Sequence, residues 1–161
     1  MVSAKQAGED RLEDYSNAGR DYSDIVADGS GLGSDFDGGT SYAAPRVSRV
    51  AALLAQEFPA LSVEQIRASI LLGARVPYEI SWNSFVVPRF LPTRSGGILD
   101  EKATRKVAQH IHDTQLAQPM TFEIASEILN RLACSDSVTT QACQLAKLKL
   151  DWMKGSQAFP L

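Results

Sequence analysis

The residue of this chain best placed to do chemistry is a serine that follows a glycine turn and opens a long apolar stretch. Residues 37–45 read Asp-Gly-Gly-Thr-Ser-Tyr-Ala-Ala-Pro, with the serine at position 41. Glycines permit a sharp turn and let backbone or substrate approach closely. The start of a helix offers unpaired N–H groups and the positive end of the helix dipole, which stabilise a developing oxyanion. Ser41 is therefore a candidate nucleophile, provided that a base lies beside it.

The same residues have a purely structural alternative. Serine and threonine are common N-cap residues, because their hydroxyl accepts a hydrogen bond from the first turn of a helix. Thr40 or Ser41 would then only cap a helix after the glycine turn. Pro45 is compatible with either interpretation, since the N–H that it lacks is expected to lie close to the unpaired groups of the first turn.

The elements that must position Ser41 follow from the spacing of apolar residues. Short apolar runs at residues 1–4 and 24–27, joined by turn-forming residues, predict two strands. Residues 41–58 have apolar side chains at helical spacing. The run at 51–55 (Ala-Ala-Leu-Leu-Ala) is apolar almost all round, which predicts a helix buried in a large core.

The rest of the chain is predicted to be mainly helical. Ser62 and Gln65 have the spacing of a capping box, so a second helix begins there, and Gly73 is expected to end it. Three prolines and short β-rich runs predict a loop with short strands over residues 76–94. Further helices are predicted at 100–112, 122–133 and 139–154. The change to purely helical texture places a domain boundary near residue 113, and the tail after it is either a helical hairpin packed on the first domain or a partner-binding appendage.

Composition and charge exclude several classes of protein. The 161 residues are 44% hydrophobic and 22% charged, which is too apolar for a disordered chain and sufficient for a core. No apolar run approaches the roughly 20 residues of a membrane span. Residues 1–45 carry nine acidic and three basic side chains, whereas residues 46–161 carry ten and thirteen. Neither part has the dense basic stripe of a nucleic-acid-binding protein, so we predict no nucleic acid and no membrane span.

The two cysteines, Cys134 and Cys143, leave two interpretations open. They form a disulfide that pins a helical hairpin, or they are a pair of reduced thiols. Zinc would need two further ligands, and His110 and His112 lie at no standard zinc spacing.

Residues 38–74 resemble the serine motif of the subtilisin-like serine peptidases (subtilases). That motif reads Gly-Thr-Ser-x-Ala-x-Pro, and it is followed by a central helix, a proline-bounded break and a helix that begins Leu-Ser or Leu-Thr. Upstream, residues 1–4, 15–19 and 25–29 resemble the strands and turns that precede the serine loop. Downstream, residues 95–103 resemble the Gly-x-Gly segment that leads to the last helix of the catalytic domain. The resemblance covers residues 1–112.

The resemblance implies an α/β fold: the C-terminal part of a three-layer, parallel-sheet domain (residues 1–112) followed by a helical extension (113–161). Ser41 is then the nucleophile of a serine endopeptidase acting on polypeptides. Its backbone N–H and the Thr40 hydroxyl help to bind the oxyanion, and Gly39 gives the turn. The helix that starts at Ser41 is expected to be buried beside the parallel sheet. Subtilases are usually exported, but the first residues lack the features of a signal peptide, so no compartment is predicted.

No cofactor is implied, and structural calcium is the one alternative considered. Subtilases often bind calcium, and the glycine-rich stretch before Ser41 is acidic. No glutamate closes an EF-hand loop at the right distance, so solvated loop acids explain these carboxylates as well. The carboxylates concerned are Asp21, Asp24, Asp28, Asp35 and Asp37.

Several departures from the subtilase pattern stand out. The family orders its triad Asp, His, Ser, with an oxyanion asparagine between the histidine and the serine. The 40 residues before Ser41 contain no histidine, and their only asparagine, Asn17, matches a Tyr-Ser-Asn turn instead. Asp28 stands where the family commonly has proline. Arg49 stands where a small residue often packs, and so long a cation must find a partner or reach water.

Two hypotheses follow. The chain is the serine-bearing part of a serine endopeptidase whose Asp, His and oxyanion Asn lie in a preceding part or in a second chain. The alternative is a catalytically inert interaction or packing module derived from a subtilase. A serine without its base retains only about 10³ to 10⁴-fold catalysis over water, so we expect the isolated chain to be inactive. We also expect exposed edges on the strands at 1–4 and 24–27, so that the chain aggregates or needs a partner to complete the sheet.

Overall fold

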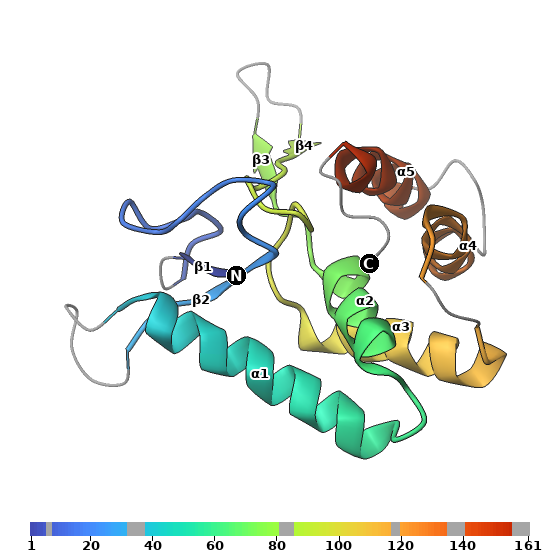
Figure 1. The fold of residues 1–161 in the computed structure, drawn as a ribbon. Coiled ribbons are helices and arrows are strands. Elements are labelled where there is room, and N and C mark those ends of the chain that lie inside the picture. Colours follow the sequence, from blue (N-terminus) through green and yellow to red (C-terminus); the bar gives the residue numbers. More distant parts are fainter. Residues whose placement is uncertain (6–7, 32–37, 81–85, 117–119, 135–140, 156–161) are drawn as a thin grey trace.

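The computed structural model describes residues 1–5, 8–31, 38–80, 86–116, 120–134 and 141–155, and it has a mixed α/β fold (Figure 1). The helices and strands follow the sequence closely. The strands expected around residues 80–87 fall partly on 81–85, and the helix expected at 139–154 begins on 139–140, both outside the described residues. In chain order the elements are β1 (Val2–Lys5), β2 (Ile25–Asp28), α1 (Thr40–Glu57), α2 (Val63–Gly73), β3 (Tyr78–Ile80), β4 (Val86–Pro88), α3 (Glu101–Thr114), α4 (Phe122–Ala133) and α5 (Gln141–Lys154). None of the described helices combines the length and the apolarity needed to cross a lipid bilayer.

The sheet that leads to Ser41 is built on β1 and β2, which pair in parallel with Ser3 opposite Val26. Single bridges extend it beyond β2. Val26 pairs in parallel with Ile98, and Ile98 pairs antiparallel with Arg75. The order across the sheet is therefore β1, β2, residues 97–99 and residue 75, so that β2 has a neighbour on both sides.

The outer edge of β1 is also engaged. The backbone N–H of Ala4 donates to Ser16 Oγ at 2.8 Å, and the N–H of Glu13 donates to the Ala4 carbonyl at 3.1 Å. The connection between the two strands thus folds back over β1. The expectation of exposed edges is wrong for β2, which residues 97–99 cover, and for the middle of β1, which the connection between the two strands covers.

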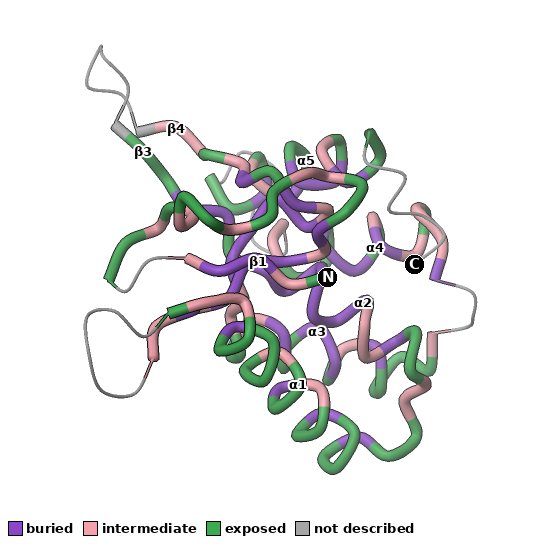
Figure 2. The backbone as a smooth tube through the Cα atoms, turned by 60° about the vertical axis from the view of Figure 1, so that its left-hand side comes forward, coloured by how far each residue is buried: buried purple, intermediate pink, exposed green. Residues whose placement is uncertain are grey.

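Helix α1 packs on β1 and β2 through one face only. Ala43 lies against Ala4 and Ala27 of the two strands, and Val50 and Leu54 continue the same buried face. On the outward face Ala52 and Ala55 are exposed, and Leu53, on the flank toward α3, retains 40% of its accessible surface. Figure 2 shows the outward side of α1 as exposed residues. The prediction that residues 51–55 are buried all round is wrong, because no described element covers this second face.

Among the described elements, α2 and α3 make the most extensive helix–helix contact. The capping box at the start of α2 is confirmed: Ser62 Oγ accepts from the Gln65 N–H, and the Ser62 N–H donates to Gln65 Oε1. Gly73 is the last residue of α2 but has no left-handed backbone. A Cβ at this position would lie 2.4 Å from Thr104 Cα, so glycine is required by the contact with α3 rather than by the helix end.

Helices α4 and α5 form a hairpin that shares the main core. Cys134 at the end of α4 and Cys143 in α5 form a disulfide, which decides between the two interpretations of these cysteines. Ile128 and Leu150 are buried in the same cluster as Leu71 of α2. The hairpin therefore shares a core with α2 rather than forming a core of its own.

Candidate active site

The loop before Ser41 is fastened to the end of β2. The Gly39 N–H donates to the Gly29 carbonyl at 2.8 Å, and Ser30 forms an antiparallel bridge with Gly38. A side chain has no room at residue 29, where a Cβ would lie 2.5 Å from Ala4 Cβ, and little room at residue 38, where a Cβ would lie 3.3 Å from the Gly29 carbonyl oxygen. Close packing of these glycines fixes the entry into α1.

The first turn of α1 carries no side-chain cap. Gly39 is the N-cap residue in an extended conformation, and its carbonyl accepts from the N–H groups of Tyr42 and Ala43. Neither the Thr40 nor the Ser41 hydroxyl caps the helix, so the capping interpretation is wrong. Among the residues that the structure describes, none accepts from the N–H groups of Thr40 and Ser41 or hydrogen-bonds the Ser41 hydroxyl. The Ser41 side chain is exposed, beside N–H groups that are free to bind an anion.

Pro45 lies deeper in α1 than the sequence suggested. It follows Thr40 by five residues, and the N–H that it lacks would have donated to the Ser41 carbonyl. The interpretation of Pro45 as a residue beside the unpaired first turn is therefore wrong. Its effect is to leave the carbonyl of Ser41 without an i+4 donor.

A charged contact that is not among the sequence-based predictions joins the end of β2 to the first turns of α1. Asp28 accepts from both the N–H (2.9 Å) and the hydroxyl (2.6 Å) of Ser30 and pairs with Arg46 of α1 at 3.4 Å. Burial raises the pKa of Asp28, but the hydrogen bonds from Ser30 and the charges of Arg46 and Lys5 outweigh it, so the pKa lies below its usual value. The available signal was the Asp-Gly-Ser sequence, which is typical of a turn closed by the aspartate side chain.

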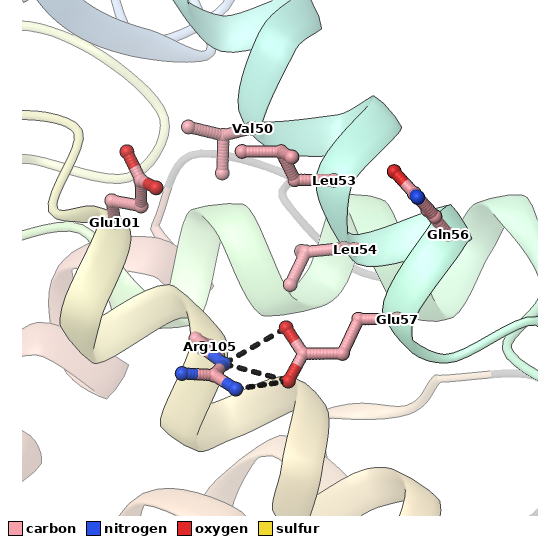
Figure 3. A pocket seen from close by; sticks show the side chains of 7 residues that line it. All are labelled: Val50, Leu53, Leu54, Gln56, Glu57, Glu101 and Arg105. Atoms are coloured by element: carbon pink, nitrogen blue, oxygen red, sulfur yellow. Dashed lines mark hydrogen bonds and ion pairs between the residues drawn. The ribbon is translucent and has the colours of Figure 1, made fainter.

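The uncovered face of α1 borders a groove of about 420 Å³ against α3 (Figure 3). Val50, Leu53 and Leu54 form its apolar floor, and Glu57 and Arg105 are joined by hydrogen bonds at one end. At the α3 start, Arg49 pairs with Glu101 at 2.8 Å and keeps 63% of its side chain exposed. The expectation that this cation finds a partner or reaches water is confirmed on both counts.

The metal candidates receive no support from the described residues. Within the described ranges no cluster of three or more histidine, cysteine, aspartate or glutamate side chains is arranged to hold an ion. Asp24 pairs with Arg67 and Arg94 instead. Asp35 and Asp37 lie outside the described residues.

Comparison with known protein families shows to which family this arrangement of strand, glycine loop and helix belongs. The model of the subtilase family matches residues 1–115, which include β1 through α3 and the whole Ser41 loop. The chain belongs to the subtilase family. No curated protein and no solved structure matches it. The match identifies residues 1–115 as a domain of serine-peptidase origin, whereas α4 and α5 lie beyond it.

In this subtilase neither histidine lies near Ser41. The His112 ring contacts Phe58, the residue that follows α1, with ring centroids 5.5 Å apart. At 1.5 Å per residue, Phe58 lies roughly 25 Å along α1 from Ser41. His110 is two residues away on α3. A general base must come within about 3 Å of the proton that it removes, so neither histidine serves Ser41 in this arrangement.

Proposed function

We propose that Ser41 is the nucleophile of a serine endopeptidase centre that this chain provides in part. The observation that carries the proposal is the exposed hydroxyl of Ser41 at an uncapped helix N-terminus, on a loop that glycine packing holds in place. Membership of the subtilase family supports it. The wider architecture we propose is the C-terminal part of a three-layer, parallel-sheet domain, with residues 113–161 as a helical extension.

The proposed chemistry assigns a role to each residue of the loop. A histidine from outside the described residues takes the proton from Ser41 Oγ, which attacks the carbonyl carbon of a peptide bond. The Ser41 N–H and the Thr40 hydroxyl stabilise the resulting oxyanion, and Gly39 keeps the turn open. Collapse of the intermediate breaks the C–N bond, the histidine protonates the departing amine, and water then hydrolyses the acyl-enzyme. Serine, histidine and aspartate together require no cofactor for these steps.

A further polypeptide is needed to complete this centre, and the uncovered face of α1 is where we place it. Leu53 and the groove beside it, with Val50 and Leu54 as its apolar part, form a surface that a completing segment would bury, together with Ala52 and Ala55 on the outward side of the helix. The segment is either a preceding part of the same protein or a second chain, and it supplies the Asp, the His and the oxyanion Asn.

A fluorophosphonate probe tests the proposal. We expect no labelling of the 161-residue chain alone, and labelling of Ser41 once the chain is joined to a subtilase segment that carries the Asp, His and Asn motifs. The Ser41→Ala variant is the control in both experiments. Labelling of the chain alone, or a folded and complemented protein that never reacts, contradicts the proposal. Translation of the DNA immediately upstream of Met1 shows whether the natural protein contains such a segment.

The distance of both histidines from Ser41 favours one alternative, an inert packing or interaction module. In that case the complementing segment binds, but the complex does not label at Ser41. The binding measurement and the labelling measurement together separate the two functions.

A further inference from the structure

Trp152 of α5, which lies beyond the family match, occupies a site built by residues of the subtilase domain. Its ring stacks on Phe90 with centroids 5.0 Å apart, and the Arg20 guanidinium lies 4.2 Å from the ring centroid. The Trp152 Nε1–H donates to the Thr93 carbonyl at 3.0 Å. Gly96 lies directly beneath the indole, where a Cβ would come within 2.9 Å of the ring and 2.7 Å of Phe90.

Lys149 makes a second attachment one turn earlier on α5. Its Nζ is buried and donates to the carbonyls of Leu72 (2.7 Å) and Ala74 (2.5 Å) at the end of α2. These carbonyls belong to the last turn of the helix and the residue after it, where hydrogen-bond partners are lacking. A lysine that reaches them satisfies the end of α2 from another element.

The two attachments lie directly beside the outer segments of the sheet. Ala74 lies immediately before Arg75, and Gly96 lies immediately before the segment 97–99, which contains Ile98. Arg75 and Ile98 exchange two backbone hydrogen bonds of 2.8 Å. Helix α5 therefore holds the chain immediately before each of the two segments that form this pair.

Hydrogen bonds continue from that pair to the serine loop. The Leu99 N–H donates to the Val26 carbonyl at 2.7 Å, and the Val26 N–H donates to the Gly97 carbonyl at 3.1 Å. Val26 lies in β2, and the carbonyl of Gly29, the residue after β2, accepts from the Gly39 N–H. Backbone contacts thus connect the Trp152 site with the residue that begins the first turn of α1.

We propose that α5 is an intramolecular brace: Trp152 and Lys149 hold the outer edge of the sheet and thereby position the loop that carries Ser41. The disulfide between Cys134 and Cys143 tethers this brace to α4. Trp152 and Lys149 are positioning residues, since neither contacts Ser41. The proposal goes beyond the proposed peptidase function and is testable without activity.

Amide hydrogen exchange of the full chain, followed by NMR, tests the brace in the variant Trp152→Ala. We expect the amides of Arg75, Ile98 and Leu99 to exchange at least tenfold faster, and those of Val26 and Gly39 severalfold faster. The Leu54 amide, in the last turn of α1 and far from the serine loop, is the internal reference and should change little. Leu148→Ala removes an exposed side chain of the same helix and should leave all these rates unchanged.

The variant Ile111→Val shows the exchange pattern of a uniform loss of stability, with which Trp152→Ala is compared. It removes a methylene from the buried face of α3, far from the sheet edge. If Trp152→Ala only accelerates all amides in the pattern of Ile111→Val, or changes none at residues 97–99, the brace is contradicted. Lys149→Met provides the second test if Trp152→Ala does not fold, with faster exchange expected first at Arg75. Failure of Ser41 to label leaves these rates unaffected, and unchanged rates leave the Ser41 proposal intact, so the two proposals fail separately.

Discussion

Gly73 of α2 and Thr104 of α3 lie in backbone contact, with no room for a side chain between them. A Cβ on residue 73 would lie 2.4 Å from Thr104 Cα and 2.5 Å from its N. Neither backbone can yield without separating the two helices. We therefore expect Gly73→Ala to lower the free energy of unfolding by about 3 kcal/mol or more, measured by urea denaturation.

Gly39→Ala is the matched control for this substitution. Gly39 has extended backbone, and the nearest atom to an added Cβ is Ser41 Oγ at 3.4 Å. Its effect on stability should stay within about 1 kcal/mol, since an N-cap alanine is only moderately unfavourable. If the two variants are equally stable, the close contact between α2 and α3 is not present in solution.

The buried amine of Lys149 predicts a stability that depends on pH. Burial lowers the pKa of Lys149 to about 7 and the charge of Asp100 opposes this, whereas the unfolded chain has the ordinary value of 10.5. Between these values the unfolded state binds a proton that the folded state does not, so stability rises with pH from about 7 toward 10. The neutral amine keeps two N–H groups, enough for both carbonyls.

Urea denaturation at pH 7, 8 and 9 measures this contribution. The slope from this one group is at most about 1.4 kcal/mol per pH unit. We expect Lys149→Met to flatten the rise and the exposed Lys154→Met to leave it unchanged. Identical slopes for the wild type and Lys149→Met would show that the amine keeps its proton in the fold.

The disulfide predicts a stability that depends on reducing agent. Cys134 and Cys143 lie nine positions apart in sequence and close a short loop, and such a crosslink is worth about 2–3 kcal/mol in the chain-entropy description. A reducing agent should lower the unfolding free energy by this amount. The double variant Cys134→Ala/Cys143→Ala should have the lower stability already and show no response to reduction. A response of the double variant would assign the effect to another cause.

Features set by neighbours in sequence were predictable, and features set by distant contacts were not. The capping box at Ser62 and the spans of the helices depend on residues a few positions apart, and the structure has them as expected. Gly73 was assigned to a helix end because glycine is common there, but its reason is the crossing with α3. The pairing of Cys134 with Cys143 depends on how α4 and α5 lie, which spacing alone left open.

In the candidate site, too, the features set by sequence neighbours were predictable and those set by distant contacts were not. Ser41 and its glycines were identified from a contiguous motif, whereas the contact of Arg46 with Asp28 joins residues on different elements. Lys149 resembles a surface lysine in the sequence, because nothing in its own helix reveals that the end of α2 lies opposite. The burial of α1 was predicted from its composition, but composition does not say which element provides the cover.

Leu53 and Leu54 provide the test of that uncovered face, since they are adjacent in α1 but point to different surroundings. Leu54 is 3% exposed and Leu53 is 40% exposed. In the chain alone, Leu54→Ala should lower the unfolding free energy by about 2–5 kcal/mol, and Leu53→Ala by less than about 1 kcal/mol.

With the complementing subtilase segment, Leu53→Ala should weaken binding at least fivefold, or about 1 kcal/mol, because the segment buries that side chain. The measurements are urea denaturation for the first pair of values and titration calorimetry for the second. Unchanged affinity of Leu53→Ala would place the completing segment on another surface of the chain.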